Sequence, residues 1–137
     1  MKTSIALALL LISLFAVCAY AQGGGAVKIN LDPDVGWAII NTTASSKLNA
    51  TVHLDNGRPN EDFSISIRVR YEDNSTVAFT DIATLSTNGQ GKGNVQVKVD
   101  LDPPAGSTTL RRVAVRVRRP GPPNILYTAV AWDLPLK

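Results

Sequence analysis

The sequence has little of the chemistry on which enzymes and metal sites depend. Its 137 residues contain one cysteine, Cys18, and one histidine, His53. Catalysis by a serine or cysteine nucleophile needs a histidine base, and a zinc site needs several histidine or cysteine ligands. His53 stands in the middle of an alternating stretch, where an ordinary surface histidine is the simpler interpretation. We therefore expect no enzymatic activity, no metal site and no cofactor.

Acidic side chains leave two alternatives open. Four aspartates form two closely spaced pairs, Asp32 with Asp34 and Asp100 with Asp102. Calcium takes such oxygen ligands, but aspartate beside proline or glycine is also ordinary turn chemistry, and no EF-hand loop is present. The acid pairs at residues 61–62 and 72–73 could in principle serve a glycoside hydrolase. Neighbouring residues of a strand point to opposite faces, so we expect these acids to be solvated.

The only long apolar run lies at the N-terminus. Residues 1–21 start with one lysine, continue through an unbroken apolar stretch and end in Ala-Tyr-Ala. This pattern is typical of a secretory signal peptide, cut after Ala21. An uncleaved anchor is one alternative, although the stretch is shorter than the roughly 20 residues of a spanning helix. A lipid anchor on Cys18 is another, but Val17 stands where a lipobox has a small residue.

Cleavage after Ala21 predicts an exported protein, secreted or held at the cell surface. Residues 22–25 then form a flexible leader, and residues 26–137 form a single domain without cysteine and hence without a disulfide. Of the 14 basic residues, Lys2 leaves with the signal, so 13 face 11 acidic ones and the net charge is +2. Such a small excess is unlike the basic surface of nucleic-acid-binding proteins. We expect no nucleic-acid partner, and no membrane span after cleavage.

The rest of the chain alternates between apolar and polar residues, with a period of two that is typical of strands. The predicted strands cover residues 26–31, 37–43, 47–54, 63–71, 75–87, 95–101, 111–119 and 125–134, with a bulge or break near Asp81. No stretch shows the 3.6-residue period of an amphipathic helix. Seven to eight short strands joined by glycine, proline and asparagine turns predict an all-β fold, an antiparallel two-sheet sandwich.

The order of these strands resembles an immunoglobulin-like sandwich. KLNATVHL resembles its second strand, FSISIRVRY its third, LRRVAVRVRR its sixth and ILYTAVAW its last. The resemblance spans almost the whole mature chain, but the cysteine pair and the tryptophan of antibody domains are missing, so no functional residue is transferred. It implies that the third and sixth strands are neighbours in one sheet.

Arginine is concentrated in RRVAVRVRR, residues 111–119, which holds five of them. Its period of two directs the valines inward and Arg112, Arg116 and Arg118 outward, whereas Arg111 and Arg119 fall at the ends. The neighbouring strand implied by the resemblance adds Arg68 and Arg70 to the same outward face. Like charges across a ladder are mildly destabilising, so this cluster invites a counter-charge.

Several counter-charges fit these arginines: an acidic polysaccharide, lipid headgroups, an acidic patch on a partner protein, or a local acid such as Glu72. The alternative is that arginine only keeps an exposed strand soluble and deters edge pairing. Nucleic acid fits poorly, because no aromatic residues interleave for base stacking. Four aromatic residues come into question for a glycan: Trp37, Tyr71, Tyr127 and Trp132, with Tyr71 expected in the core.

Three N-x-Ser/Thr sequons begin at Asn41, Asn49 and Asn74, and they are predicted N-glycosylation sites if the organism has the machinery. The sequence as a whole predicts an exported, non-enzymatic structural or interaction module at the cell surface or outside the cell, alone or with like subunits. One form of assembly would have the leader and first strand pair with a neighbour's sheet; the simpler alternative is that this strand pairs within its own domain. The alternative is a small domain that binds a glycan or another polyanion through its basic sheet face.

Overall fold

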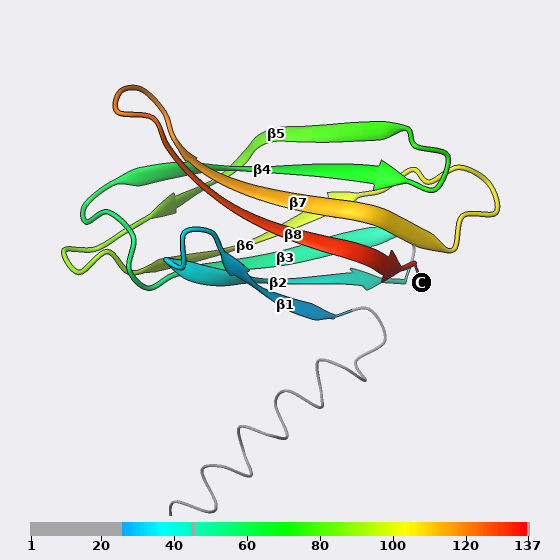
Figure 1. The fold of residues 1–137 in the computed structure, drawn as a ribbon, viewed down its shortest axis with the longest axis horizontal. Helices are drawn as coiled ribbons and strands as arrows, with labels where there is room; N and C mark the ends of the chain where they lie inside the picture. The colour runs from blue at the N-terminus through cyan, green and yellow to red at the C-terminus, as the bar shows by residue number, and fades with distance from the viewer. Residues whose placement is uncertain (1–25, 45, 137) are drawn as a thin grey trace, which may run out of the picture.

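The fold consists of strands only. The computed structural model describes residues 26–44 and 46–136, and this part of the chain forms eight strands and no helix (Figure 1). The strands are β1 (Val27–Leu31), β2 (Gly36–Thr43), β3 (Lys47–Leu54), β4 (Asp62–Tyr71), β5 (Thr76–Ser86), β6 (Gly93–Asp100), β7 (Thr109–Arg119) and β8 (Ile125–Pro135). Each lies within two residues of its predicted range, because alternation and turn residues mark strand ends clearly in this sequence.

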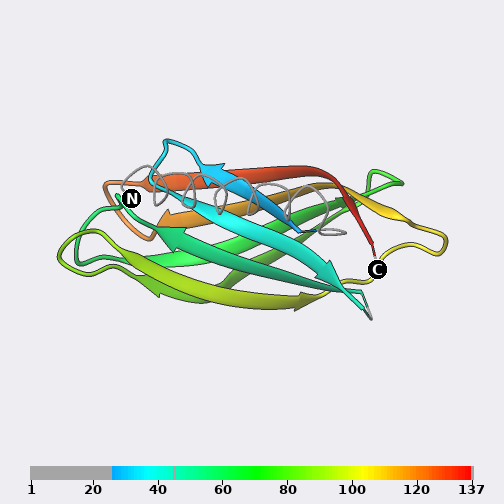
Figure 2. The same ribbon diagram turned by 90° about the horizontal axis from the view of Figure 1, so that it is seen from below.

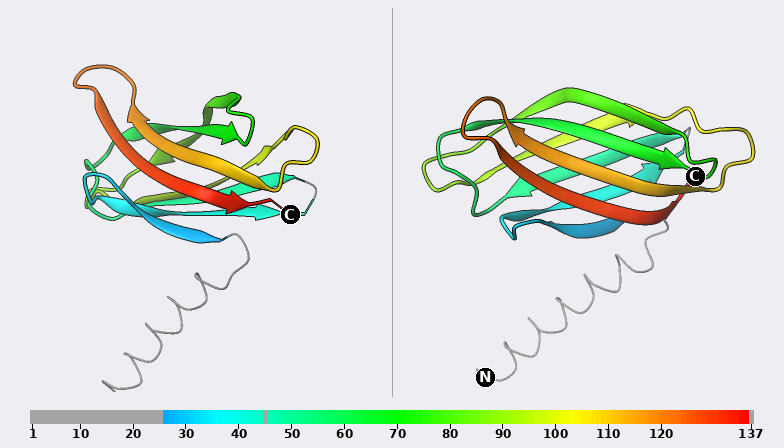
Figure 3. Two further views of the ribbon diagram at one scale, coloured as in Figure 1. Left: turned by 45° about the vertical axis from the view of Figure 1, so that its right-hand side comes forward. Right: turned by 45° about the horizontal axis from the view of Figure 1, so that its top comes forward.

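Two antiparallel sheets of four strands face each other, which confirms the predicted two-sheet sandwich. Sheet A has the order β1-β2-β3-β6 and sheet B the order β5-β4-β7-β8. Figure 3 shows sheet B, with β7 and β8 in orange and red, lying across sheet A. β4 and β7, which resemble the third and sixth strands of an immunoglobulin-like sandwich, are neighbours in the centre of sheet B. Membership of the immunoglobulin-like group stays a prediction.

The core lies between the sheets and is built from the inward residues of both. In β4 every inward side chain is at most 2% exposed: Phe63, Ile65, Ile67, Val69 and Tyr71. Each large apolar side chain that is fully buried in this way contributes about 1.5–3 kcal/mol. Tyr71 is in the core, as predicted, and its hydroxyl accepts a hydrogen bond from the Asp102 backbone N–H at 3.2 Å. The buried aromatic therefore keeps a partner for its polar end.

One side of the sandwich is partly closed by the backbone. β1 runs beside β8 (Figure 2), and Asp32 at the end of β1 forms an isolated antiparallel bridge with Thr128 of β8. The Asp32 N–H donates to the Thr128 carbonyl at 2.8 Å, and the Thr128 N–H donates back at 3.2 Å. Within residues 26–44 and 46–136, the first strand thus pairs inside its own sandwich.

The predicted irregularity near Asp81 is confirmed as a register shift between β4 and β5. Ile65 pairs with Ala83 but Ile67 pairs with Phe79, so β5 carries extra residues opposite Ser66. Asp81 lies in this bulge with a φ of 51°. This value is in the left-handed region, which aspartate tolerates better than most residues. The bulge turns the Asp81 side chain toward the outer face of β4, where its carboxylate accepts a hydrogen bond from the Ser64 hydroxyl.

The predicted signal peptide, the leader at residues 22–25 and the anchor alternatives at Cys18 lie outside the described residues and stay predictions. In the described part of the chain, no helix has the length and apolar character needed to span a membrane.

Candidate anion-binding face

Five arginine side chains share the outer face of sheet B. They come from its two central strands, Arg68 and Arg70 from β4 and Arg112, Arg116 and Arg118 from β7, and we call this set the arginine face. Four of the five are exposed and Arg112 is half-buried. Between them the inward residues of β7, such as Val113 and Val115, are fully buried. Strand alternation therefore produces the core and the arginine face from alternate residues of the same strand.

The register sets the spacing of the charges. Arg70 lies directly opposite Arg112, and Arg116 and Arg118 lie opposite Ser66 and Ser64. Residues two apart on a strand are about 7 Å from each other, and neighbouring strands are about 4.8 Å apart. The charges from Arg112 to Arg118 thus extend over roughly 20 Å along the strands. They form a band and not a single point of positive charge.

Counter-charge on this face is scarce. Of its five arginines, only Arg118 has a carboxylate within 4.0 Å among the described residues: its Nη2 is 4.0 Å from Asp81 Oδ1. Both side chains of this pair are 57% exposed, so solvent screens their attraction. No sequence pattern pointed to Asp81 as a partner, because its place on the face depends on the bulge in β5.

Glu72, considered above as a local counter-acid, serves another purpose. Its Oε1 accepts hydrogen bonds from both the backbone N–H and the hydroxyl of Thr108 and Thr109, at 2.7 to 3.0 Å. These four donors favour the charged form and lower the pKa of Glu72 from 4.5 to about 2. Glu72 therefore ties the start of β7 to the end of β4.

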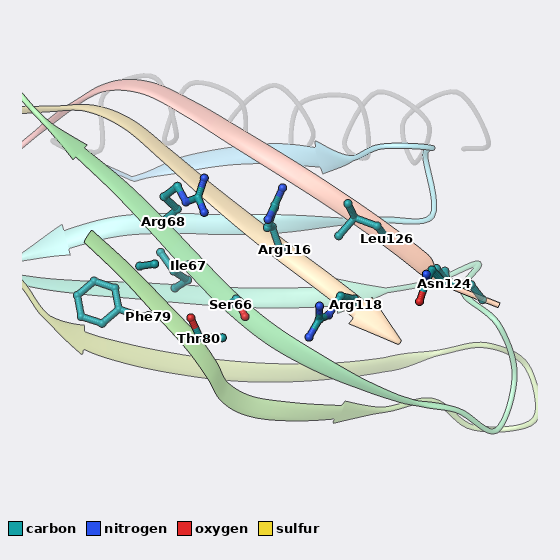
Figure 4. Close-up of a pocket in the computed structure, with 11 residues that line it drawn as sticks. Ser66, Ile67, Arg68, Phe79, Thr80, Arg116, Arg118, Asn124 and Leu126 are labelled. Atoms are coloured by element: carbon teal, nitrogen blue, oxygen red, sulfur yellow. The ribbon is translucent and has the colours of Figure 1, made fainter. Parts of the chain in front are cut away.

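Small residues open two hollows on the arginine face. Arg68 is flanked in register by Ala78 of β5 and Ala114 of β7, whose short side chains leave space on either side of it. The larger hollow has a volume of about 490 Å³, and Figure 4 shows Arg68, Arg116 and Arg118 around it. The smaller hollow has about 220 Å³, and its lining includes Arg68 and Arg112. Arg68 thus lies at the boundary of both.

One aromatic side chain lies at the end of the arginine face. Trp132 of β8 pairs in register with Arg112, and the Arg112 guanidinium carbon is 5.5 Å from the centre of the indole ring. Trp132 remains 64% exposed. The Nε of Arg112 is buried and has no hydrogen-bond partner among the described residues. The guanidinium of Arg112 therefore lies over the indole ring and also lines the smaller hollow.

The other three aromatic residues considered for a glycan are not available on this face. Tyr71 and Tyr127 are buried, and Tyr127 packs against Phe63 with ring centres 5.6 Å apart. Trp37 lies on the outer face of sheet A, where His53 stacks on it at 4.7 Å and the Lys28 ammonium lies 4.8 Å from its ring centre. His53 is thus part of a surface stack.

Arg119 is held by contacts of its own at the end of β7. Its Nε donates to Glu61 Oε2 at 3.0 Å, and its Nη1 donates to the carbonyls of Pro122 and Pro123 at 3.0 and 3.3 Å. Only 20% of its side chain is exposed. Arg111 is the extra residue of a second register shift, because Arg70 pairs with Arg112 and Tyr71 with Leu110. Neither arginine belongs to the arginine face.

The three sequon asparagines differ in their surroundings. Asn41 of β2 lies directly opposite Asn49 of β3 on the outer face of sheet A, and the Asn49 Oδ1 is buried without a partner among the described residues. Two glycans cannot easily occupy side chains about 5 Å apart. Asn74 is exposed in the turn between β4 and β5. It is the acceptor with the most open surroundings.

Neither possible metal ligands in the described residues nor comparison with known proteins points to a second site. The described ranges contain no group of three or more histidine, cysteine, aspartate or glutamate side chains that could hold a metal ion. No known protein family matches the sequence, and no curated protein is similar enough to count as a relative. Function is therefore inferred from the geometry of the arginine face.

Proposed function

We propose that the protein is an exported, non-enzymatic interaction module that works at the cell surface or outside the cell and binds an acidic partner through the arginine face. One observation carries this proposal. Five outward arginines cover the two central strands of sheet B, and a single carboxylate lies within 4.0 Å of any of them in the described part of the chain.

The position of the arginines argues against a purely protective role. Charged side chains deter unwanted pairing when they lie on edge strands, but β4 and β7 are paired on both sides. Arg70 and Arg112 are direct cross-strand neighbours, an arrangement of like charges that costs roughly 0.2–1 kcal/mol. A bound anion would remove this cost.

The choice of residue also favours anion binding. All five cations on this face are arginine, although the sequence contains lysine elsewhere, for example at Lys28, Lys47 and Lys98 on the outer face of sheet A. Lysine would keep the sheet equally soluble. The planar guanidinium presents paired donors that match carboxylate, sulfate or phosphate oxygens, and it is less strongly hydrated than an ammonium group.

Binding is tested with two variants that lose the same charge. The first carries Arg68→Ser, Arg70→Ser and Arg116→Ser; the control carries Lys28→Ser, Lys47→Ser and Lys98→Ser. Solvent-screened contacts of about 0.5–1 kcal/mol each predict a loss of polyanion affinity of roughly 10-fold to 100-fold in the first variant only. Isothermal titration with heparin and with polyglutamate measures it. Equal losses in both variants, or no binding of either polymer to the unchanged protein, would refute the proposal.

Export is tested separately, by expressing the whole chain and identifying the N-terminus of the released protein. Cleavage after Ala21 predicts that the protein begins at Gln22. A protein that stays in the membrane fraction with residues 1–21 attached would contradict release and support the anchor.

A further inference from the structure

We infer that the partner of the arginine face is an acidic polysaccharide, with carboxylate or sulfate groups on its pyranose rings, which lies along β7 and stacks one ring on Trp132. This inference rests on the proposed function and specifies its ligand. It is carried by three features of sheet B: its paired backbone, its hydroxyl side chains and its exposed indole.

The paired backbone disfavours an extended peptide as the ligand. A peptide that binds a sheet as a strand needs free N–H and C=O groups at an edge. The arginine face lies over β4 and β7, and each of these strands has a hydrogen-bonded neighbour on both sides. An acidic peptide laid across the face would therefore find no backbone partner there, whereas a polysaccharide has no backbone amides to satisfy.

The side chains between the arginines suit the hydroxyl groups of a sugar. The outward positions of sheet B that carry a hydroxyl include Ser64, Ser66, Thr76, Thr84 and Thr128. Thr76 lies in register with Arg70, and Thr128 lies in register with Arg116. Hydroxyl groups both donate and accept hydrogen bonds, as those of a sugar do. Hydroxyl-bearing positions thus lie beside the arginines on this face, as hydroxyls lie beside the acidic groups of an acidic sugar chain.

Trp132 supplies what a simple anion-binding surface would not need. An indole that is 64% exposed offers an apolar plane of the kind on which the CH groups of a pyranose ring pack. Arg112 lies against that indole and also lines the smaller hollow with Arg68 and Arg70. A ring on Trp132 can therefore direct its acidic group to these three guanidinium groups.

The larger hollow continues the path. It is lined by Arg116 and Arg118 and reaches the start of β8, where Leu126 is 45% exposed (Figure 4). Both hollows have Arg68 in their lining, so they are neighbours on sheet B, and Trp132 lies beside the smaller one through its contact with Arg112. A polymer with several acidic rings can occupy both hollows at once, and simultaneous occupation raises its affinity above that of a single sugar.

The experiment compares polymers that differ in ring and charge: polygalacturonate, dextran sulfate, neutral dextran and polyglutamate. Affinities are measured by titration for the unchanged protein, for Trp132→Ala and for Trp37→Ala, which removes the other tryptophan from the opposite sheet. We expect Trp132→Ala to weaken the binding of at least one acidic polysaccharide by about tenfold. The same change should leave polyglutamate binding unaltered, and Trp37→Ala should leave both unaltered. Circular dichroism checks that each variant is folded.

The other outcomes separate the inference from the proposed function. If polyglutamate binds more tightly than either acidic polysaccharide, the partner is an acidic protein and the glycan inference is wrong. If Trp132→Ala leaves the affinity for every polymer unchanged while the arginine variant lowers the affinity for every polyanion, anion binding by the arginine face is supported and stacking on Trp132 is refuted. If none of the charged polymers binds, both proposals fail.

Discussion

If an acidic ligand binds the arginine face as proposed, Asp81 competes with it for Arg118, and removing the charge of Asp81 should strengthen ligand binding. The perturbation is Asp81→Asn. Asparagine tolerates the positive φ of 51° at this position, and its side-chain oxygen can still accept the hydrogen bond that the Ser64 hydroxyl donates to Asp81. The bulge in β5 is therefore expected to persist, and the change acts on charge.

The size of the effect follows from the geometry. Two unit charges 4.0 Å apart, as Arg118 Nη2 and Asp81 Oδ1 are, attract each other by about 1 kcal/mol in water. Both groups are more than half exposed, and exposed pairs of this kind contribute roughly 0.2–1 kcal/mol. A ligand that no longer displaces this attraction should bind roughly 1.4-fold to fivefold more tightly.

The assay is titration with a polyanion at two salt concentrations. The gain should shrink at the higher one, since added salt screens exposed charges. Asp34→Asn is the matched control, because Asp34 is also exposed, also has a positive φ, at 54°, and lies in a turn of sheet A away from the arginine face. If Asp34→Asn strengthens binding as much as Asp81→Asn does, the effect is one of net charge and the role of Asp81 is refuted.

Three further predictions concern stability and modification. Glu72→Gln should lower the melting temperature at neutral pH, where the charged Glu72 stabilises the fold. The folded pKa of Glu72, about 2, lies below the ordinary 4.5, so this stabilisation is lost as the pH falls from 4.5 toward 2. A difference in melting temperature between the two proteins that stays constant over that range contradicts the assignment. Ile67→Ala, at a core position 1% exposed, should lower the free energy of unfolding in urea by about 2–5 kcal/mol, and a loss below 1 kcal/mol would mean that this position is not packed as described. In a glycosylating host, Asn74→Gln should remove more glycan mass than Asn41→Gln, as measured by mass spectrometry of the released protein. The reverse result would show that accessibility in the folded state does not determine which sequon is glycosylated.

Much of the fold could be predicted because its signals are local. The alternation in β4 and β7 fixed which residues face the core, and turn residues marked the strand ends. Even the irregularity at Asp81 could be expected, since a polar residue there interrupts an apolar stretch. The placement of Arg68 beside β7 needed one more step, the strand order implied by a resemblance, because alternation says nothing about which strands are neighbours.

The parts that escaped prediction depend on contacts between distant residues. The pairing of Arg118 with Asp81 arises only after β5 is aligned on β4. Trp132 and Trp37 both occur in alternating stretches, yet His53 stacks on one while the other stays open beside Arg112. Glu72 looked like any acid at a strand end until the Thr108 and Thr109 donors surrounded it. Residue type alone does not distinguish these cases.

The alternation of valine and arginine in β7 also limits how this surface can evolve. An insertion of one residue between Val113 and Val117 would exchange the two faces, placing guanidinium groups in the core and valines in solvent. Point substitutions can alter the arginine face without disturbing the core, but a change of chain length between these valines cannot. Only the two register shifts, at Arg111 and around Asp81, can absorb a gained or lost residue, and such length changes would alter the spacing of the charges while the core is preserved.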